Sequence, residues 1–474
     1  MSKRSLVANF LSVLGAIAPA SALASGAETI GPGLSALWIV PFAGILLSIA
    51  VAPVTVPAFW HRHFGKATAF WALAFLVPFT FHFGPRLAVQ EVAHALLLEY
   101  VPFIILLLAL YTISGGIHIG GNLRTSAEVN TAFLALGTML ASVMGTTGAS
   151  MLLIRPLLRA NDNRRHRAHV IVFFIFLVAN IGGALTPLGD PPLFLGFLKG
   201  VDFFWTLRAM LLPTLLASTV LLLAFYLIDR WLLSQEDERR PAELDPTPSE
   251  PLAIRGGLNL LLLAGVLASV LVSGIWTPGL GLDVLGVRVE LQNAVRDASL
   301  LALAWTSWKL TPKVLRVANA YSWAPIIEVA KIFAGIFLTI IPAIALLRAG
   351  NDGVFAPLFA LMAEPSGAPR DAAYFWVTGM LSSFLDNAPT YLVFFNVAGG
   401  DPVALTGPLA STLVAISAGA VFMGANTYVG NAPNFMVRAI AETSGVRMPS
   451  FFGYMGWALL ALTPIYVLIT FLFF

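Results

Sequence analysis

NIGGALTPLGDPPLF, residues 180–194, interrupts an apolar run from Val170 to Phe197 that is long enough to cross a bilayer. Its three prolines remove backbone donors and its three glycines loosen the remaining turns, so no uninterrupted helix accommodates it. Asp190 lies in that break. An unwound backbone with a carboxylate at membrane depth is tolerated only where it faces protein or a water-filled cavity. The alternative is a loop that merely follows a short helix.

A second copy of the stretch favours the broken helix over the loop. GANTYVGNAPNF, residues 424–435, aligns without a gap to residues 183–194, at an offset of 241 (424 minus 183). Six of the twelve positions are identical, and Asp190 is aligned with Asn431. Two broken helices at corresponding positions of two halves indicate the binding site of a secondary transporter.

The composition is that of a polytopic membrane protein, with 58% hydrophobic and 11% charged residues and a mean hydropathy of +0.85. The absence of cysteine excludes disulfides, thiolate metal sites and cysteine catalysis. We find no metalloprotease, Walker, nucleophile-elbow or nucleic-acid motif, so we expect neither an enzyme nor a nucleic-acid partner. The expected setting is the lipid bilayer of a bacterial-type inner membrane, crossed many times.

The chain divides into four parts. Residues 1–25 carry two early basic residues and a small-residue cleavage pattern, and are a signal peptide or a first transmembrane helix. Residues 34–233 form the first repeat, 234–251 a proline-rich cytoplasmic linker, and 252–474 the second repeat. The basic segment His61–Lys66 is expected to be a cytoplasmic turn. The second half starts from the opposite side, so the repeats are predicted to be inverted.

Each repeat also contains an apolar hairpin. Asn130 to Leu158 has arginines beyond both ends, Arg124 among them, so we expect it to enter and leave on the cytoplasmic side as a re-entrant hairpin. Asp371 to Asn396 has both ends outside on the same count. The predicted fold is therefore an all-α polytopic membrane protein with two inverted repeats, each with a re-entrant hairpin and a broken transmembrane helix.

Half-helix ends leave unpaired backbone groups which, with hydroxyl and amide side chains, replace the hydration shell of an ion. The candidate ligands are the polar residues of the hairpin tips and breaks: Thr146, Thr147, Thr186, Asp190, Asp386, Asn387, Thr390, Asn426, Thr427 and Asn431. Asp190 and Asp386 are the predicted Na+ ligands, because a carboxylate at the bilayer centre costs ~2.5–3.5 kcal/mol and is usually functional. Burial disfavours the charged carboxylate and a bound cation favours it, so protons and cations compete. The alternative is that an aspartate caps a half-helix.

Other polar groups within the predicted spans have weaker claims. His94, Glu99 and Asn180 are relay groups or satisfied packing residues, and packing is the favoured interpretation. Arg155 and Arg159 are expected to anchor the first hairpin at the interface.

The motifs Thr-Pro-Leu-Gly-Asp190 and Asp386-Asn-Ala-Pro-Thr390, with the paired hairpins, resemble the ion transporter superfamily, which includes NhaD-type sodium/proton antiporters and citrate transporters. The resemblance covers most of the chain after residue 30. It implies a scaffold with a mobile transport unit, a homodimer, an elevator-like mechanism, and sodium- and proton-binding roles for the two aspartates. The first hairpin tip departs from the pattern, since it reads Gly-Thr-Thr-Gly148 where an Asp-Asn pair is expected.

The leading hypothesis is a Na+/H+ antiporter with alternating access at the hairpin tips and broken helices. The alternative is a cation-coupled transporter of citrate or another carboxylate. Na+ and H+ are the expected transported or coupling ions, with no cofactor. A membrane-embedded structural or enzymatic subunit has no motif in its favour.

Overall fold

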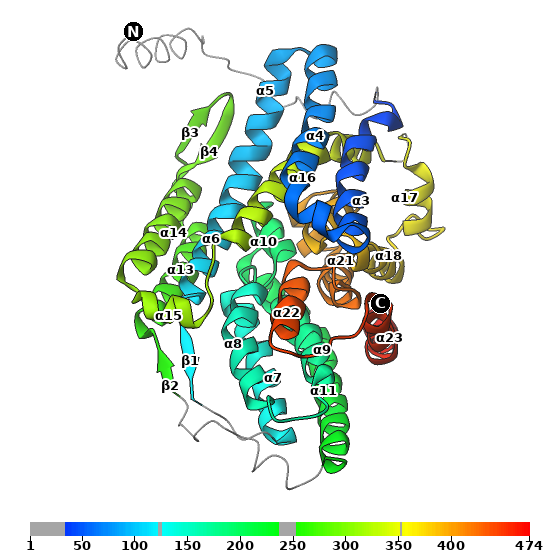
Figure 1. The fold of residues 1–474 in the computed structure, drawn as a ribbon. Helices are drawn as coiled ribbons and strands as arrows, with labels where there is room; N and C mark the ends of the chain where they lie inside the picture. Colours follow the sequence, from blue (N-terminus) through cyan, green and yellow to red (C-terminus); the bar gives the residue numbers. More distant parts are fainter. Residues whose placement is uncertain (1–33, 122–125, 237–252, 351–352) are drawn as a thin grey trace.

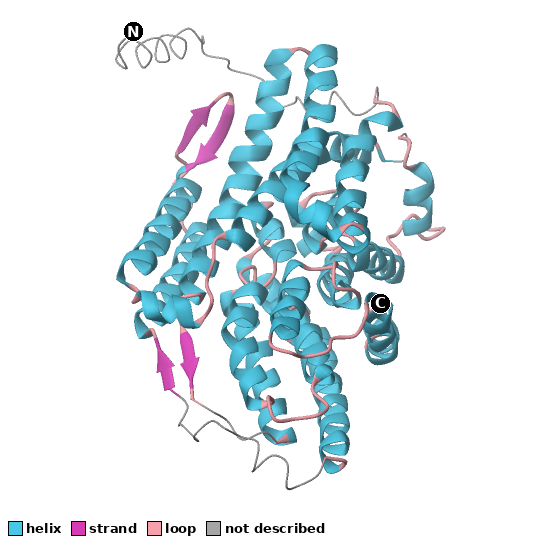
Figure 2. Cartoon of the chain, viewed as in Figure 1, coloured by secondary structure: helices cyan, strands magenta, loops and turns pink. Residues whose placement is uncertain are grey.

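The computed structural model describes residues 34–121, 126–236, 253–350 and 353–474, which are mainly helical (Figures 1 and 2). The predicted signal peptide or first helix at 1–25, Arg124, and the linker from residue 237 lie outside the described residues. Nine helices in the described ranges are long and apolar enough to cross a membrane. The chain is therefore an all-α polytopic membrane protein, as the sequence predicts.

The elements of the first half follow in this order: η2 (Ala36–Ile39), α3 (Val40–Thr55), α4 (Pro57–Phe83), α5 (Pro85–His94), the π-helical segment η3 (Ala95–Tyr100), α6 (Val101–Ser114), β1 (His118–Gly120), α7 (Ala127–Met144), α8 (Thr146–Ala160), α9 (Ala168–Leu177), η4 (Ile181–Leu185), α10 (Pro191–Leu198) and α11 (Phe203–Ser234).

The elements of the second half are β2 (Ala253–Arg255), α13 (Gly257–Ile275), β3 (Gly281–Val284), β4 (Val287–Glu290), α14 (Leu291–Leu310), α15 (Lys313–Ala318), α16 (Ala324–Arg348), α17 (Ala356–Met362), α18 (Asp371–Phe384), α19 (Asn387–Val397), α20 (Pro402–Thr406), α21 (Ala410–Met423), η6 (Gly424–Asn426), α22 (Ala432–Thr443), α23 (Phe451–Ala461) and α24 (Thr463–Phe473). In Figure 1 the antiparallel strand pairs β1–β2 and β3–β4 lie on the left, below and above the helices α13 and α14.

Both predicted hairpins are pairs of helices with tight connections. α7 and α8 are joined by Gly145 alone, whose φ of +79° is one that glycine adopts without strain. α18 and α19 are joined by Leu385 and Asp386. Re-entry into a membrane and the inversion of the repeats remain predictions.

Both predicted helix breaks are present. Between α9 and α10 the chain passes through η4 and then an extended stretch that ends at Asp190. Between α21 and α22 it passes through η6 and a stretch that ends at Asn431. In both places a proline at the first or second position of the next helix restarts it, where the missing N–H costs nothing.

Three boundaries differ from the sequence-based expectations. The predicted turn His61–Lys66 is helical and lies within α4, because Pro57 starts that helix directly after Val56. The second broken helix, which the sequence predicts from Val403 to Phe435, begins at Ala410, because the short helix α20 precedes it and is capped at Gly407. The last span, which the sequence predicts from Phe451 to Phe474, is divided at Leu462, just before α24 starts with a proline at its second position.

The helices pack into two groups that each draw on both halves of the chain. In the scaffold group, α3 to α6 pack with α13, α14 and α16. In the hairpin group, α7 to α11 pack with α18 to α24. The two groups meet mainly where α16 contacts α19, α6 contacts α8, and α10 contacts η3 and α6. Figure 1 shows α13 and α14 on one side of the molecule and α7, α8 and α11 below the centre.

A buried charged cluster fastens the base of the first hairpin. The Asp229 carboxylate pairs with the Arg164 guanidinium and accepts hydrogen bonds from His169 Nε2 at 2.7 Å and Asn130 Nδ2 at 2.9 Å. The side chains of Arg164 and Asp229 are fully buried. Because these residues come from α7, α9, α11 and the α8–α9 loop, the cluster ties four segments of the hairpin group together.

Candidate functional site

The two helix breaks are narrow because glycines allow their backbones to double back. A Cβ at Gly189 would lie 2.1 Å from the carbonyl oxygen of Gly183, and a Cβ at Gly430 would lie 2.5 Å from that of Gly424. Both distances are shorter than real Cβ contacts, so only glycine fits without movement of the chain. The second pair follows the first at the offset of 241.

Serine and threonine side chains fasten each break to its hairpin with the same bonds. In the first half, Thr186 Oγ1 donates to the carbonyl of Ser142, and Ser142 Oγ donates to the carbonyl of Gly182 at 2.5 Å. In the second half, Thr427 Oγ1 donates to the carbonyl of Ser383 at 2.5 Å, and Ser383 Oγ donates to the carbonyl of Met423, the last residue of α21, at 3.1 Å. Each atom pair in one half matches a pair 241 residues later in the other.

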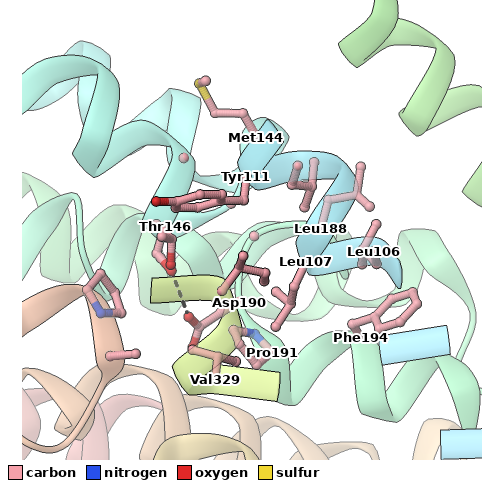
Figure 3. A pocket seen from close by; sticks show the side chains of 18 of the residues that line it. Leu106, Leu107, Tyr111, Met144, Thr146, Leu188, Asp190, Pro191, Phe194 and Val329 are labelled. Atoms are coloured by element: carbon pink, nitrogen blue, oxygen red, sulfur yellow. Dashed lines mark hydrogen bonds between the residues drawn. The ribbon is translucent and has the colours of Figure 1, made fainter. Parts of the chain in front are cut away.

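The two hairpin tips and the two helix breaks meet at Asp190. The buried carboxylate accepts a hydrogen bond from Thr146 Oγ1 at 3.1 Å and one from Asn431 Nδ2 at 3.2 Å, both on Oδ1, while Asn387 Nδ2 donates to Oδ2. Figure 3 shows the Thr146 hydroxyl pointing at the Asp190 carboxylate. The donors come from the first hairpin tip, the second break and the second hairpin tip. Three donors and no acceptor suit an ionised carboxylate.

An amide network connects the two breaks behind Asp190. Asn431 Nδ2 also donates to the carbonyl of Ala179 at 3.0 Å, and Asn180 Nδ2 donates to Asn434 Oδ1 at 2.7 Å. Asn434 Nδ2 in turn donates to two carbonyls of the second break, each at 2.9 Å. The network satisfies carbonyls that the broken helix leaves free and holds the Asn431 amide beside Asp190.

Asp386 occupies a different environment from Asp190. Its side chain is half-buried, and its Oδ1 accepts the backbone N–H of Ala388 at 3.1 Å as the cap of α19. Thr390 Oγ1 donates to the backbone carbonyl of Asp386 at 3.0 Å. These bonds are those of a helix cap, which the sequence left open as an alternative. A role for Asp386 in cation binding remains a prediction.

The other predicted residues are distributed around the breaks. Asn426 Nδ2 donates to Ser383 Oγ at 2.9 Å, and Thr427 Oγ1 accepts the backbone N–H of Gly430 at 3.1 Å, so both hold the second break in shape. Thr186 does the same in the first break, and Thr147 lies on the wall of the cavity beside Asp190. The structure thus gathers Thr146, Asn387 and Asn431 on Asp190 and leaves the rest in supporting positions.

A cavity of about 90 Å³ lies beside Asp190. It is lined mainly by apolar side chains of α6, α10, α16 and α22, including Leu106, Leu107 and Phe194 (Figure 3). Its polar lining side chains are Tyr111, Thr146, Thr147 and Asp190. Among the described residues that line it there is no Lys, Arg or His. A single water needs roughly 10–15 Å³ by this measure, so the cavity has room for a small cation and a few waters.

Four supporting residues were not among the sequence-based candidates. Ser142 and Ser383 are identical residues at the offset of 241, so the repeat itself contained the signal that identifies them. Asn434 lies inside the second repeated stretch, but it is aligned with the apolar Leu193, so the repeat does not indicate a polar role at this position. For Asn180 the sequence favours a satisfied packing residue over a relay group, and the structure shows its amide donating to Asn434 of the other half.

Comparison with known proteins identifies the family. A family model described as "Putative citrate transport" matches residues 31–474, nearly the whole chain. A search of curated proteins found no match. Within the described ranges, no three side chains of His, Asp or Glu form a group that could hold a metal ion. The broken helices, the helical hairpins and the match over almost the whole length agree, and the chain belongs to this family of membrane transporters.

Proposed function

We propose that the protein is a secondary transporter that exchanges Na+ for H+ at Asp190. The observation that carries this proposal is the carboxylate itself, buried where both hairpin tips and the second break donate to it, beside a cavity whose described lining has no cationic side chain. A buried carboxylate without a cationic partner is balanced by either a proton or a bound cation. Exchange requires a carboxylate that binds either a proton or a cation, but not both at once.

The side-chain amide of Asn387 can interact with Asp190 in its protonated form and in its cation-bound form. Its Nδ2 donates to Asp190, while its buried Oδ1 has no hydrogen-bond partner among the described residues. Rotation of the amide by half a turn turns that oxygen toward Asp190. The oxygen then accepts the proton of a neutral Asp190 or coordinates a cation that the carboxylate holds. Thr146 Oγ1 and backbone oxygens of the breaks supply further oxygen ligands of the kind that Na+ takes.

The site is less suited to an organic anion. Negatively charged ligands commonly bind at helix N-termini, through free N–H groups. α10 begins with Pro191 and Pro192, which have no N–H, and the next N–H, of Leu193, donates to the carbonyl of Asp190. The Thr146 N–H at the start of α8 donates to the carbonyl of Gly189 at 2.8 Å. An anion would therefore meet the Asp190 carboxylate with few donors to offset the repulsion.

Cation-coupled transport of citrate is the second candidate, and the description of the family favours it. In that function, Asp190 would hold the coupling cation and the anion would bind elsewhere on the path. Both functions use alternating access at the same hairpin tips and broken helices.

Flux measurements in proteoliposomes distinguish the two candidates. With a pH gradient imposed and no organic anion present, addition of Na+ should dissipate the gradient, and a pH-sensitive dye in the lumen reports it. The exchange proposal would be overturned by two results together: a Na+ gradient drives citrate uptake, and Na+ moves no protons when citrate is absent. Asp401→Asn is a matched control, because Asp401 is an exposed helix cap whose bond to Val403 N an asparagine can also accept.

A further inference from the structure

One ion pair joins the two groups of helices. Lys199 Nζ of the hairpin group contacts Glu99 Oε1 of the scaffold group. Every other ion pair between described residues lies within one of the two groups, except the Arg288–Glu290 pair, which lies within strand β4. The Glu99 side chain is 8% exposed and that of Lys199 23%, so the pair is shielded from solvent.

Both partners lie at irregular points of their helices. Glu99 is in η3, the π-helical segment that interrupts the long helix from Pro85 to Ser114. Such segments are frequent at functional sites because they displace the backbone within an otherwise regular helix. Lys199 is the C-cap of α10, the half-helix that starts directly after Asp190. The pair therefore connects the scaffold to the element that begins at the exchange site.

A second cavity, of about 60 Å³, lies beside the ion pair. Its described lining includes the charged or titratable side chains Glu91 and His94 of α5, Arg348 of α16, and the pair itself. His94 and Arg348 are exposed, so this cavity lies near the surface. From the loop charges, this is the side predicted to be external.

Buried aromatic rings separate the second cavity from the Asp190 cavity. Phe337 lines the second cavity and Phe103 lines the Asp190 cavity, and their ring centroids are 5.8 Å apart. Both side chains are at most 1% exposed. In this conformation the two rings pack together between the cavities, and the ion pair lines the second one.

We propose that Glu99 and Lys199 form the external gate of the transporter, an inference that rests on the proposed alternating access. The ion pair holds α10 against η3, and the two residues separate when the hairpin group moves to expose Asp190 to the external side. The ion pair stabilises only the closed conformation, in which α10 lies against η3. Removing the pair therefore shifts the equilibrium toward the open conformation. Because the pair is largely buried, salt screens it less than an exposed pair.

Cysteine labelling tests the gate without any flux measurement. The chain has no cysteine, so Leu107→Cys places a single thiol in the wall of the Asp190 cavity. In right-side-out vesicles, a membrane-impermeant maleimide should label it slowly in the parent and at least threefold faster when Glu99→Gln or Lys199→Gln is added. The double variant should label no faster than the quicker single variant, because each change removes the same interaction.

Arg208→Gln is the matched control. It breaks an exposed ion pair with Asp202, and both residues of that pair belong to the hairpin group. Labelling of both gate variants at the control rate would overturn the proposal, and so would effects that multiply in the double variant. Glu99→Asp, which keeps the charge but shortens the reach, provides a milder variant and should give an intermediate rate. Because labelling requires no Na+/H+ exchange, loss of the proposed function would not alter this result.

Discussion

At the scale of single residues, the two predicted sodium ligands differ in their hydrogen bonding. The bonds found on the Asp190 carboxylate come from side chains of other elements, whereas the Asp386 carboxylate accepts the backbone N–H of its own helix. A carboxylate held by amides and a hydroxyl can change its occupant when those groups rotate. A helix cap has a fixed donor, whose loss destabilises the helix by about 1 kcal/mol.

Replacement of Asp190 by asparagine should abolish exchange and preserve the fold. Asp190→Asn keeps the size of the side chain but removes the charge, and a neutral amide is cheaper to bury than a carboxylate. The matching position already carries Asn431, so an amide is compatible with this backbone. We expect normal expression and elution and at least a 100-fold loss of Na+-dependent proton flux in proteoliposomes.

Near-normal flux in a well-folded Asp190→Asn protein would remove Asp190 from the mechanism. Asp386 would then be the remaining predicted carboxylate, and Asp386→Asn would be the next variant to measure. Since asparagine also caps helices well, loss of flux in that variant with an unchanged unfolding temperature would point to ion binding rather than capping.

At the scale of elements, the helix breaks depend on close backbone contacts. Gly183 and Gly189 bring the two ends of the first break together, and the Thr146 N–H bonds to the carbonyl of Gly189. The position of Asp190 therefore follows from the shape of the break and from its contact with the hairpin tip.

Gly189→Ala should displace Asp190 and reduce exchange. The added methyl group would overlap the Gly183 carbonyl, and overpacking of this kind costs about 1–3 kcal/mol. We expect a lower unfolding temperature and at least a tenfold loss of flux. Gly456→Ala is the control, because a Cβ there meets nothing within 4 Å. Equal flux in the two variants would show that the break tolerates a side chain.

Asp229→Ala should destabilise the hairpin group without touching the exchange site. It leaves the buried Arg164 guanidinium without its carboxylate, and breaking a buried pair costs ~3–5 kcal/mol. Thermal unfolding in detergent measures the effect. Arg208→Ala removes an exposed pair worth ~0–1 kcal/mol, leaves the Asp202 cap of α11 in place and should leave the unfolding temperature nearly unchanged. A similar unfolding temperature for both variants would exclude a fastening role for the cluster.

At the scale of the whole molecule, each packing group combines helices from the first and second halves. Asp190 belongs to the first half, yet Asn387 and Asn431 of the second half donate to it. Neither half alone contains the complete site. This arrangement is compatible with movement of one group against the other, with the Glu99–Lys199 pair between them.

Single cysteines can test the predicted sidedness of the hairpins. Arg165→Cys lies beyond the first hairpin and Ser366→Cys precedes the second, and both positions are exposed. An impermeant maleimide added to intact cells should label Ser366→Cys and leave Arg165→Cys unlabelled until the membrane is permeabilised. External labelling of Arg165→Cys would show that the first hairpin is not re-entrant on the cytoplasmic side.

The sequence by itself determined the membrane class, the two breaks and most of the groups at the site. Proline and glycine act locally on the backbone, so their positions predict where α9 and α21 end. The repeated stretch identified Asp190 and Asn431 as equivalent positions, and the hairpin tips supplied Thr146 and Asn387 as candidates.

Only the tertiary structure decided how those groups are used. It placed three donors on Asp190, turned Asp386 toward its own helix, and brought Glu99 to Lys199 across the boundary between the two groups. Asn387 and Asp190 are 197 residues apart, and no local rule relates positions so distant. Their contact results from the packing of many helices at once, which depends on how all the side-chain surfaces fit together and not on any one stretch of sequence.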